Sequence, residues 1–230
     1  MVISHNMSYT EITEIRKSTY YIVIKRAMDI FFSILLIIFF FPFIILIAIA
    51  IKLDSKGPIL ADTPRRVGRN GKLFKMYKFR SMVENAHEIL RDSPKYSNLY
   101  NVYKKGSYKL KDDPRITKVG HFIRKHSLDE IPQALNILRG EMSLVGPRAY
   151  YPDELQEQQK KYPQTTNSVK IVLSIKPGVT GYWQVSGRSE INFDKRIQMD
   201  ATYVKKRSIL YDIWIIAKTP WAMISGKGAL

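Results

Sequence analysis

The chain of 230 residues contains no cysteine, and its 37 lysines and arginines exceed its 20 aspartates and glutamates to give a formal charge of +17. The absence of cysteine excludes disulfides and thiolate metal sites. The length allows one domain with a substantial core beyond any membrane segment. So large a positive charge predicts an anionic partner, which can be a phospholipid surface, a nucleic acid or a phosphorylated substrate.

The first predicted element is an amphipathic arm from Tyr9 to Asp29, which leads into an uncharged apolar run of 22 residues from Ile30 to Ile51. The run is long enough to cross a bilayer, since about 20 helical residues span a hydrocarbon core of roughly 30 Å. Pro42 lies near its middle and removes a helical hydrogen bond, which leaves two halves of about 15–18 Å that are each too short to cross alone. The residues therefore leave open both a kinked span and a re-entrant helix. Cations flank both ends, and the basic surplus after the run predicts a cytoplasmic C-terminal part.

Turn signals and hydrophobic spacing predict a mainly helical region after the apolar run, with one small β-hairpin. The hairpin is expected between Arg65 and Met82, because Asn70-Gly71 is a strong two-residue turn signal. Residues 93–111, rich in Tyr, Lys, Asn and Ser, are typical of an irregular, mobile connection. Helices are expected at Val83 to Asp92, Ile131 to Leu138, Tyr151 to Tyr162 and Leu210 to Ile224, the last with the Trp and Tyr content of an interfacial helix.

The residues best suited to chemistry are the adjacent carboxylates Asp129 and Glu130, which lie in a stretch rich in arginine and lysine. Nearby cations favour the ionised form of a carboxyl group. Such a pair can hold Mg²⁺, or one member can attack phosphorus while arginines bind the phosphate oxygens. The alternative is structural, because Ser127-x-x-Glu130 matches a helix capping box. Pro132 weakens that interpretation, since a proline in the fifth helical position lacks a needed N–H donor.

Other polar patterns are less specific. Lys75, Lys78 and Arg80 alternate with apolar residues, which suits either a phosphate-binding strand face or a solvated one. Residues 176–181 include three small residues and can form a phosphate loop, although a plain turn is the default interpretation. His121 and His126 are five residues apart, a poor spacing for a metal pair on one helix.

Taken together, these blocks resemble the bacterial sugar transferases known as monotopic polyprenyl-phosphate phosphoglycosyl transferases, in their small catalytic-core form. The resemblance covers nearly everything from Lys25 to the C-terminus. Its markers are Lys25-Arg26-x-x-Asp29 before the proline-broken run, Gly57-Pro58, Arg66-Val67-Gly68-Arg69-Asn70-Gly71, Lys78-Phe79-Arg80-Ser81-Met82, Ser127 to Gln133, Met142 to Arg148, and Pro177 to Arg188.

The resemblance implies a mechanism and a set of site residues. Such enzymes transfer a sugar 1-phosphate from a UDP-sugar to a polyprenyl phosphate and release UMP. Asp129 matches the nucleophile that forms a phosphosugar-aspartyl intermediate, and Glu130 matches its partner acid, with both carboxylates near Mg²⁺. The substrate-binding positions implied are Arg80, Arg124, Pro147, Arg148, Gly178, Thr180, Gly181, Gln184 and Arg188.

Two positions depart from the family pattern. Ala149 replaces the last proline of a Pro-Arg-Pro element, and Phe41 replaces the serine that often precedes the membrane proline. The first change leaves the shape of the loop around Arg148 open, and the second removes a hydroxyl that can bond a freed carbonyl.

The fold class implied is mainly α with a small β-hairpin, a membrane-embedded re-entrant helix broken at Pro42, amphipathic interfacial helices and a compact cytoplasmic catalytic domain. We expect an arm at residues 1–29, the re-entrant helix at 30–51 and the catalytic domain at 52–230, held on the cytoplasmic face of a bacterial inner membrane. Expected partners are a UDP-sugar, polyprenyl phosphate and anionic phospholipid, with no nucleic acid. The block from Trp183 to Arg188 resembles members that use plain hexoses and so favours UDP-glucose or UDP-galactose. The product would enter polysaccharide or glycoconjugate assembly, which leaves capsule, exopolysaccharide and O-antigen open. The alternatives are a glycosyltransferase that releases UDP and a non-enzymatic, membrane-anchored polyanion-binding protein.

Overall fold

The computed structural model describes residues 18–105, 110, 112–187 and 191–224, so most of the predicted arm and Arg188 lie outside the described residues. The described chain is mainly helical with two short two-stranded sheets, as expected for the fold class. The helices that precede Asp129 in the chain are α1 (Thr19–Asp54), α2 (Ala86–Asp92), α3 (Ser97–Lys105) and α4 (Lys118–Lys125). Those that follow are α5 (Gln133–Leu138), α6 (Pro152–Lys161), α7 (Thr166–Leu173), α8 (Tyr182–Ser186), α9 (Phe193–Lys206) and α10 (Ile209–Ile224).

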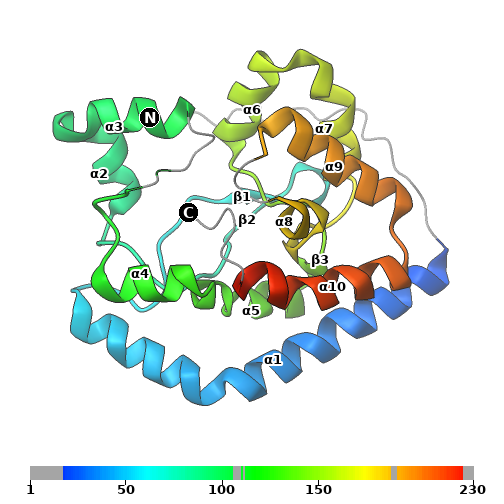
Figure 1. Ribbon diagram of the computed structural model, residues 1–230, viewed down its shortest axis with the longest axis horizontal. Helices are drawn as coiled ribbons and strands as arrows, with labels where there is room; N and C mark the ends of the chain where they lie inside the picture. Colours follow the sequence, from blue (N-terminus) through cyan, green and yellow to red (C-terminus); the bar gives the residue numbers. More distant parts are fainter. Residues whose placement is uncertain (1–17, 106–109, 111, 188–190, 225–230) are drawn as a thin grey trace.

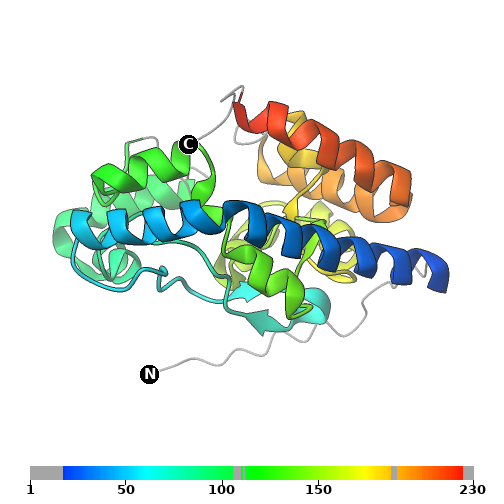
Figure 2. The same ribbon diagram turned by 90° about the horizontal axis from the view of Figure 1, so that it is seen from below.

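The apolar run belongs to one long helix, α1, which continues through Pro42. Figure 1 shows α1 bowed along the lower edge of the molecule, with both ends turned towards the rest of the chain, and Figure 2 shows it crossing the whole of that face. Its middle is strongly apolar and exposed, with Ile38 and Phe39 at 67% and 68% of their full accessibility. A helix of this length and hydropathy meets the requirement for a membrane segment.

Polar contacts hold the N-terminal half of α1 against the domain. Lys25 Nζ lies 2.8 Å from Asp212 Oδ2 of α10. The Arg26 guanidinium donates to the carbonyls of Ile137 and Leu138 at 2.6 and 2.9 Å, which satisfies acceptors at the C-terminal end of α5.

The C-terminal half of α1 is held by an apolar cluster and one polar contact. Asp54 accepts from the backbone N–H of Val119 in α4 at 3.1 Å. Ile47 and Ile51 pack with Phe79 and with Ile123 of α4. Both halves of α1 therefore dock on the same body.

The predicted hairpin is confirmed. β1 (Arg66–Val67) pairs antiparallel with β2 (Leu73–Phe74), and Arg66 lies opposite Phe74. The turn between them is the 3₁₀ segment Arg69–Gly71, in which Asn70 has φ of 56°. Asparagine and glycine tolerate this left-handed region, which explains why the dipeptide marks the turn.

A second sheet departs from the sequence prediction. β3 (Ser143–Val145) pairs in parallel with β4 (Gly178–Thr180), so the segment interpreted as a plain turn is a strand. A Cβ at Gly178 would lie 2.1 Å from the backbone nitrogen of Gly146. The small residues of this segment thus allow two backbones to approach closely.

The prediction of an irregular connection at residues 93–111 is also wrong for its first part. It forms the 3₁₀ turn Pro94–Tyr96 and then α3. Leu99, Tyr100, Tyr103 and Lys104 are half-buried on one face of α3, and Lys104 Nζ reaches Glu157 Oε1 of α6 at 2.6 Å. Tertiary contacts outweigh the polar composition here.

The main hydrophobic core joins β3 to α6, α7, α9 and α10. Its fully buried members include Leu155, Val169, Ile197, Val204 and Ile215. The predicted helix at the C-terminal end is confirmed as α10, whose other face exposes Leu210 and Trp221. Its exposed aromatic and aliphatic residues suit a membrane interface.

Candidate active site

Asp129 and Glu130 lie on a short 3₁₀ turn, Leu128–Glu130, between α4 and α5. Ser127 precedes the turn with φ of 55° and makes no side-chain capping bond, while Pro132 takes the N-cap position of α5. The capping-box alternative is therefore wrong. The carbonyl of Asp129 accepts from the backbone N–H of Phe79 at 2.9 Å, which fixes the turn against the segment after the hairpin.

Lys78 lies between the two carboxylates. Its Nζ lies 2.7 Å from Glu130 Oε1 and 3.4 Å from Asp129 Oδ2. Burial raises the pKa of the Asp129 carboxyl, and Lys78 only partly opposes that rise. Burial acts in the same direction on Glu130, but its shorter contact with Lys78, together with Arg148 and Arg66, lowers the pKa of Glu130 below its ordinary value. Lys78 is thus chiefly the counter-ion of Glu130, and Asp129 is the more weakly compensated carboxylate.

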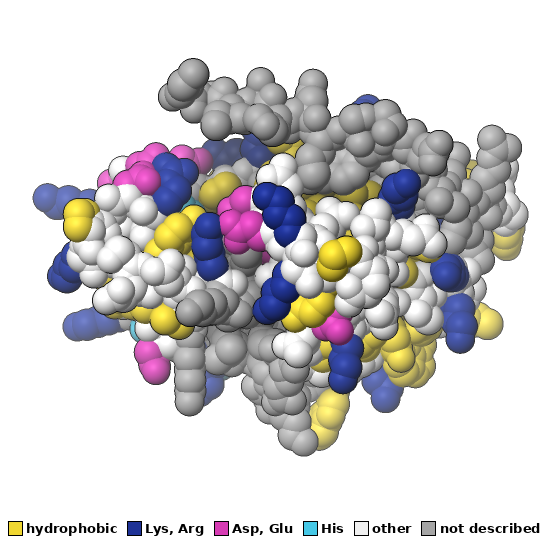
Figure 3. Space-filling model, turned by 90° about the horizontal axis from the view of Figure 1, so that it is seen from above, with side chains coloured by type: hydrophobic (Ala, Val, Ile, Leu, Met, Phe, Trp, Pro, Cys, Tyr) yellow, Lys and Arg dark blue, Asp and Glu magenta, His cyan; other side chains and the backbone are white. Residues whose placement is uncertain are grey.

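The carboxylates line a cavity of about 1230 Å³ that also includes Lys78, Arg124 and Arg148. Figure 3, viewed from the side opposite α1, shows acidic side chains close to lysines and arginines on that face of the molecule. α1 and α10 contribute apolar residues to the lining, among them Leu36 and Ile216. A polar, cationic chamber beside apolar helices suits a phosphate-bearing molecule with a hydrophobic tail.

Arg124 and Arg148, two of the predicted arginines, reach this cavity from different elements. Arg124 comes from the last turn of α4 and Arg148 from the loop after β3. The Arg148 guanidinium lies over the Trp183 ring at 5.5 Å, and its Nε is 4.0 Å from Glu154 Oε1. Burial lowers the pKa of Arg148. This half-buried guanidinium, stacked on an aromatic ring, is placed to bind phosphate oxygens.

The loop around Arg148 is held by backbone contacts. Pro147 is buried, and its carbonyl accepts from Gly178 N at 2.8 Å. The backbone N–H of Arg148 donates to Asp200 Oδ2 at 3.1 Å. Ala149, which departs from the family pattern, is buried and accepts from Arg66 Nη1 at 3.1 Å. The arginine therefore keeps a defined loop without the second proline.

The substrate-binding positions that the family resemblance implies around β4 make different kinds of contact in the structure. Gly178 and Gly181 both lie against the backbone of Gly146, so they serve close packing. Thr180 shares a 2.8 Å hydrogen bond with Thr219 of α10. Gln184 donates to the carbonyl of Val179 at 2.8 Å.

Unsatisfied polar atoms beside the cavity point to a bound group. Gln184 Oε1, the Trp183 Nε1 and Arg148 Nε are buried without a hydrogen-bond partner among the described residues. Buried polar atoms normally have partners. These three are candidates for contact with a polar substrate or water.

Arg80 also lines this cavity, next to the segment that carries Lys78. It is buried, and its terminal nitrogens donate to the carbonyls of Ile51, Ser55 and Lys56. These contacts satisfy acceptors at the C-terminal end of α1. The structure thus gives Arg80 a structural part, which ties α1 to the segment that carries Lys78.

Lys78 contacts both carboxylates, and the sequence pattern did not assign it to the candidate site. The alternation of Lys75, Lys78 and Arg80 with apolar residues does not show which of these cations faces Asp129. Among the residues described, no group of three or more histidines and acids is placed to hold a metal ion. Asp129 and Glu130 remain two adjacent carboxylates on one cavity.

Comparison with known proteins identifies relatives over nearly the whole chain. The family model described as "Bacterial sugar transferase" matches residues 20–226. The undecaprenyl-phosphate galactose phosphotransferase of Salmonella typhimurium is 43% identical over 90% of this chain and 41% of its own length. The exopolysaccharide production protein ExoY of Sinorhizobium fredii is 39% identical over 89% of this chain and 87% of its own length. The UDP-glucose:undecaprenyl-phosphate glucose-1-phosphate transferase of Escherichia coli K12 is 34% identical over 90% of this chain and 41% of its own length. The chain thus spans about two fifths of the Salmonella and Escherichia proteins and most of ExoY.

Proposed function

The chain belongs to the bacterial sugar transferase family, and we propose that it transfers a hexose 1-phosphate from a UDP-sugar to undecaprenyl or another polyprenyl phosphate, with release of UMP. The observation that carries this proposal is the buried Asp129, which lines a cationic cavity walled by two apolar helices. The printed names of the Salmonella and Escherichia relatives describe transfers to undecaprenyl phosphate. The exopolysaccharide relative supports a role in polysaccharide assembly.

In the proposed reaction, a carboxylate oxygen of Asp129 attacks the sugar-proximal phosphorus. The bond from that phosphorus to the UMP oxygen breaks, and UMP leaves with the bonding electrons. An oxygen of the lipid phosphate then attacks the phosphosugar-aspartyl intermediate and regenerates the Asp129 carboxylate. Arg124 and Arg148 stabilise the negative charge that develops on the phosphate oxygens.

Two features of the chain suit the nucleophilic step. Asp129 lies deep in the cavity and its pKa is raised by burial, so its carboxylate is less stabilised by water than an exposed one. Lys78 Nζ lies 2.7 Å from Glu130 Oε1. The Glu130 charge is therefore compensated and repels the Asp129 carboxylate less.

We propose Mg²⁺ as the cofactor, held by Asp129 and Glu130 together with substrate phosphates. The donor set fits, because Mg²⁺ in phosphoryl-transfer sites uses one or two carboxylates, phosphate oxygens and water. When bound, the ion would neutralise charge on the diphosphate. Lys78 Nζ, within 3.4 Å of both carboxylates, would share them with the ion.

A product assay tests the reaction. The protein in detergent is incubated with polyprenyl phosphate, Mg²⁺ and a panel of UDP-sugars, and the released nucleotide is identified. We expect UMP, with UDP-glucose or UDP-galactose as the best donor. Release of UDP would instead indicate an ordinary glycosyltransferase, and no nucleotide release with any donor would favour a polyanion-binding protein.

We also propose that α1 re-enters the membrane and that residues 52–230 lie on the cytoplasmic face. The support is that Lys25, Arg26 and Asp54, near the two ends of α1, contact the same body. Anionic phospholipid would contact the basic flanks of the apolar run. Accessibility of charged tags at Met1 and Leu230 tests this, since tags found on opposite faces of the membrane would restore a simple span.

A further inference from the structure

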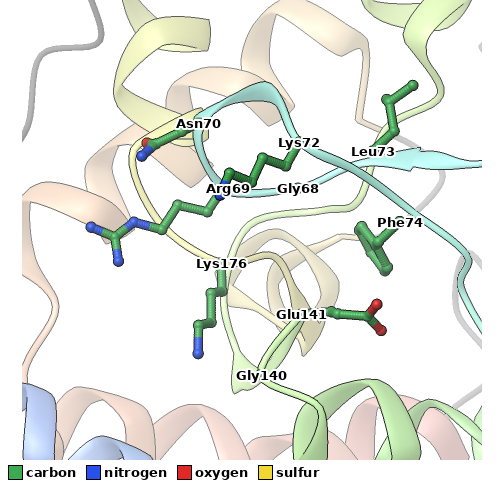
Figure 4. Close-up of a pocket in the computed structure, with 9 residues that line it drawn as sticks. All are labelled: Gly68, Arg69, Asn70, Lys72, Leu73, Phe74, Gly140, Glu141 and Lys176. Carbon is green, nitrogen blue, oxygen red and sulfur yellow. The ribbon is translucent and has the colours of Figure 1, made fainter.

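Arg66, the first residue of β1, lines the Asp129 cavity, but the reaction proposed above gives it no part. The turn of the same hairpin carries Arg69, which lines a separate cavity of about 570 Å³ together with Lys176 (Figure 4). The two cavities share no lining residue. Of these two hairpin arginines, Arg66 is therefore the one that reaches the candidate active site.

The Arg66 guanidinium is held in place by the loop that also carries Arg148. Its Nη1 donates to the carbonyl of Ala149 at 3.1 Å, and its central carbon lies 3.2 Å from the centre of the Tyr151 ring. The residue is only 7% exposed. A guanidinium has five N–H donors, and the bond to Ala149 uses one of them. These contacts fix the orientation of Arg66 and leave donors for a ligand.

Three of the other buried arginines have more partners than Arg66. Arg115 and Arg196 each form an ion pair with a carboxylate, at 2.6 and 3.2 Å, and Arg80 donates to three carbonyls. Within the part of the chain that the structure describes, Arg66 makes no ion pair, and its Nε is buried without a hydrogen-bond partner. A buried charge normally has an opposite charge or a full set of hydrogen bonds, so a bound anion would complete the surroundings of Arg66.

The charge of Arg66 acts on the groups around Asp129. Burial raises the pKa of the Glu130 carboxyl, but Lys78 and two guanidiniums outweigh that rise. These guanidiniums belong to Arg148 and Arg66. Burial, and the charges of Arg196 and Arg66, lower the pKa of Arg148. Two guanidiniums that repel each other within one cavity favour the binding of an anion such as phosphate.

We propose that Arg66 binds the nucleoside-side phosphate of the UDP-sugar and stabilises it as UMP leaves. When an oxygen of Asp129 bonds to the sugar-proximal phosphorus, the bridging oxygen departs with the bonding electrons, so the UMP phosphate gains one negative charge. A guanidinium in contact with that phosphate stabilises the charge as it develops. The inference rests on the proposed function and adds a third arginine to Arg124 and Arg148.

The position of Arg66 favours the phosphate of the donor over the phosphate of the lipid. The apolar part of the lining comes from α1 and α10, through residues such as Leu36 and Ile216, so the lipid chain would lie on that side. Figure 1 shows β1 well apart from the bow of α1. Among the described residues, the hydrogen bond and the ring contact of Arg66 are with Ala149 and Tyr151 and not with α1. Arg66 therefore lies on the side of the cavity left to the soluble donor.

Ligand-observed NMR titration of the full chain in detergent, with Mg²⁺ present throughout, tests the proposal. UMP and uridine are the probes for the donor, and the ratio of their dissociation constants reports the contribution of the phosphate. Geranyl phosphate is the probe for the lipid phosphate. The variant is Arg66→Gln. The matched control is Arg65→Gln, which removes the exposed arginine next to it in the chain.

The original chain should bind UMP more tightly than uridine. Arg66→Gln should reduce that preference about tenfold, because it removes a charge-assisted contact with phosphate, while uridine binding stays the same. Arg65→Gln should keep the preference. An unchanged preference in Arg66→Gln, an equal loss of UMP and uridine binding, or no UMP binding by the original chain would overturn the proposal. Weaker binding of geranyl phosphate with unchanged UMP binding would overturn the donor assignment in favour of the lipid phosphate.

A double variant separates direct contact from an effect on the loop that Arg66 holds at Ala149. If Arg66 contacts the phosphate itself, adding Arg66→Gln to Arg148→Gln should lower the preference for UMP further. No further loss would overturn direct contact, because Arg66 would then act only through Arg148. These titrations involve no turnover. UMP release in the product assay without the loss in Arg66→Gln would refute this inference alone, whereas the loss without UMP release would refute the transfer reaction and leave Arg66 as a phosphate-binding residue.

Discussion

Replacement of Lys78 by methionine should show how strongly its ammonium stabilises the two carboxylates of the candidate active site. The change keeps the side-chain length but leaves Asp129 and Glu130 without the ammonium that lies 3.4 and 2.7 Å away. Breaking a buried ion pair costs about 3–5 kcal/mol. The Glu130 side chain is 33% exposed, so the lower end, about 3 kcal/mol, applies. For a chain of this size that loss lowers Tm by about 6–12 °C.

The loss should depend on pH in a defined direction. Lys78 holds the pKa of Glu130 below its ordinary value of 4.5, so the carboxylate stabilises the fold above that pH. This contribution disappears as the pH falls through the lowered pKa. The difference in Tm between Lys78→Met and the original chain should therefore be full at pH 7 and shrink towards pH 4.

The matched control is Lys75→Met, three residues earlier in the same segment. Lys75 pairs with Asp62 at 3.1 Å, but the two side chains are 54% and 79% exposed, and exposed pairs contribute little. Differential scanning fluorimetry in detergent at pH 4, 5.5 and 7 measures both variants. Equal losses in the two variants, or a Lys78→Met loss that does not change with pH, would refute the reasoning.

Four further outcomes are expected. Asp129→Asn should abolish UMP release and covalent labelling by donor while membrane association persists; full activity, with reversion of the amide excluded, would remove Asp129 from the nucleophile role. Excess chelator should stop turnover and added Mg²⁺ should restore it, whereas undiminished turnover would exclude the proposed ion. Gly178→Ala should lower Tm, because its Cβ would lie 2.1 Å from Gly146 N and overpacking costs about 1–3 kcal/mol; an unchanged Tm would contradict that packing. Burial raises the pKa of Asp200 to about 7, so the folded protein loses stability as the pH rises through 7 and this carboxyl ionises. Asp200→Asn should therefore gain Tm relative to the original chain more at pH 8 than at pH 4. A Tm difference that does not change with pH would argue against a buried neutral carboxyl.

Local signals predicted the elements whose structure depends on neighbours in sequence. Asn70-Gly71 marks a turn because both residues accept left-handed backbone angles, and the hairpin formed as expected. The segments around α5, α6 and α10 have helical spacing and are helical. Local signals could not predict the β3–β4 pair, because its close approach joins Gly146 and Gly178, which are 32 positions apart in the chain. Each of these glycines would suit a turn equally well.

At the candidate site, too, a local motif was predictable from the sequence and a contact between distant residues was not. The motif around Asp129 identified a candidate nucleophile, but no local pattern distinguishes Lys75, Lys78 and Arg80 as its neighbour. The choice follows from one backbone bond, Phe79 N to the Asp129 carbonyl, which brings Lys78 to the carboxylates. In the same arrangement, the Arg80 guanidinium donates to the backbone carbonyls of Ser55 and Lys56, just after α1.

The packing of α1 indicates that this helix also supports the candidate active site. Ile47 and Ile51 share an apolar cluster with Phe79 and Ile131, the residues that flank Lys78 and Glu130 in sequence. A straight transmembrane helix held by its N-terminal contacts at Lys25 would carry Ile51 away from that cluster, since each residue adds about 1.5 Å along the axis. The bow of α1 (Figure 1) is what lets both contacts exist at once. A proline at position 42 serves this geometry, because it weakens the helix where the two halves must diverge.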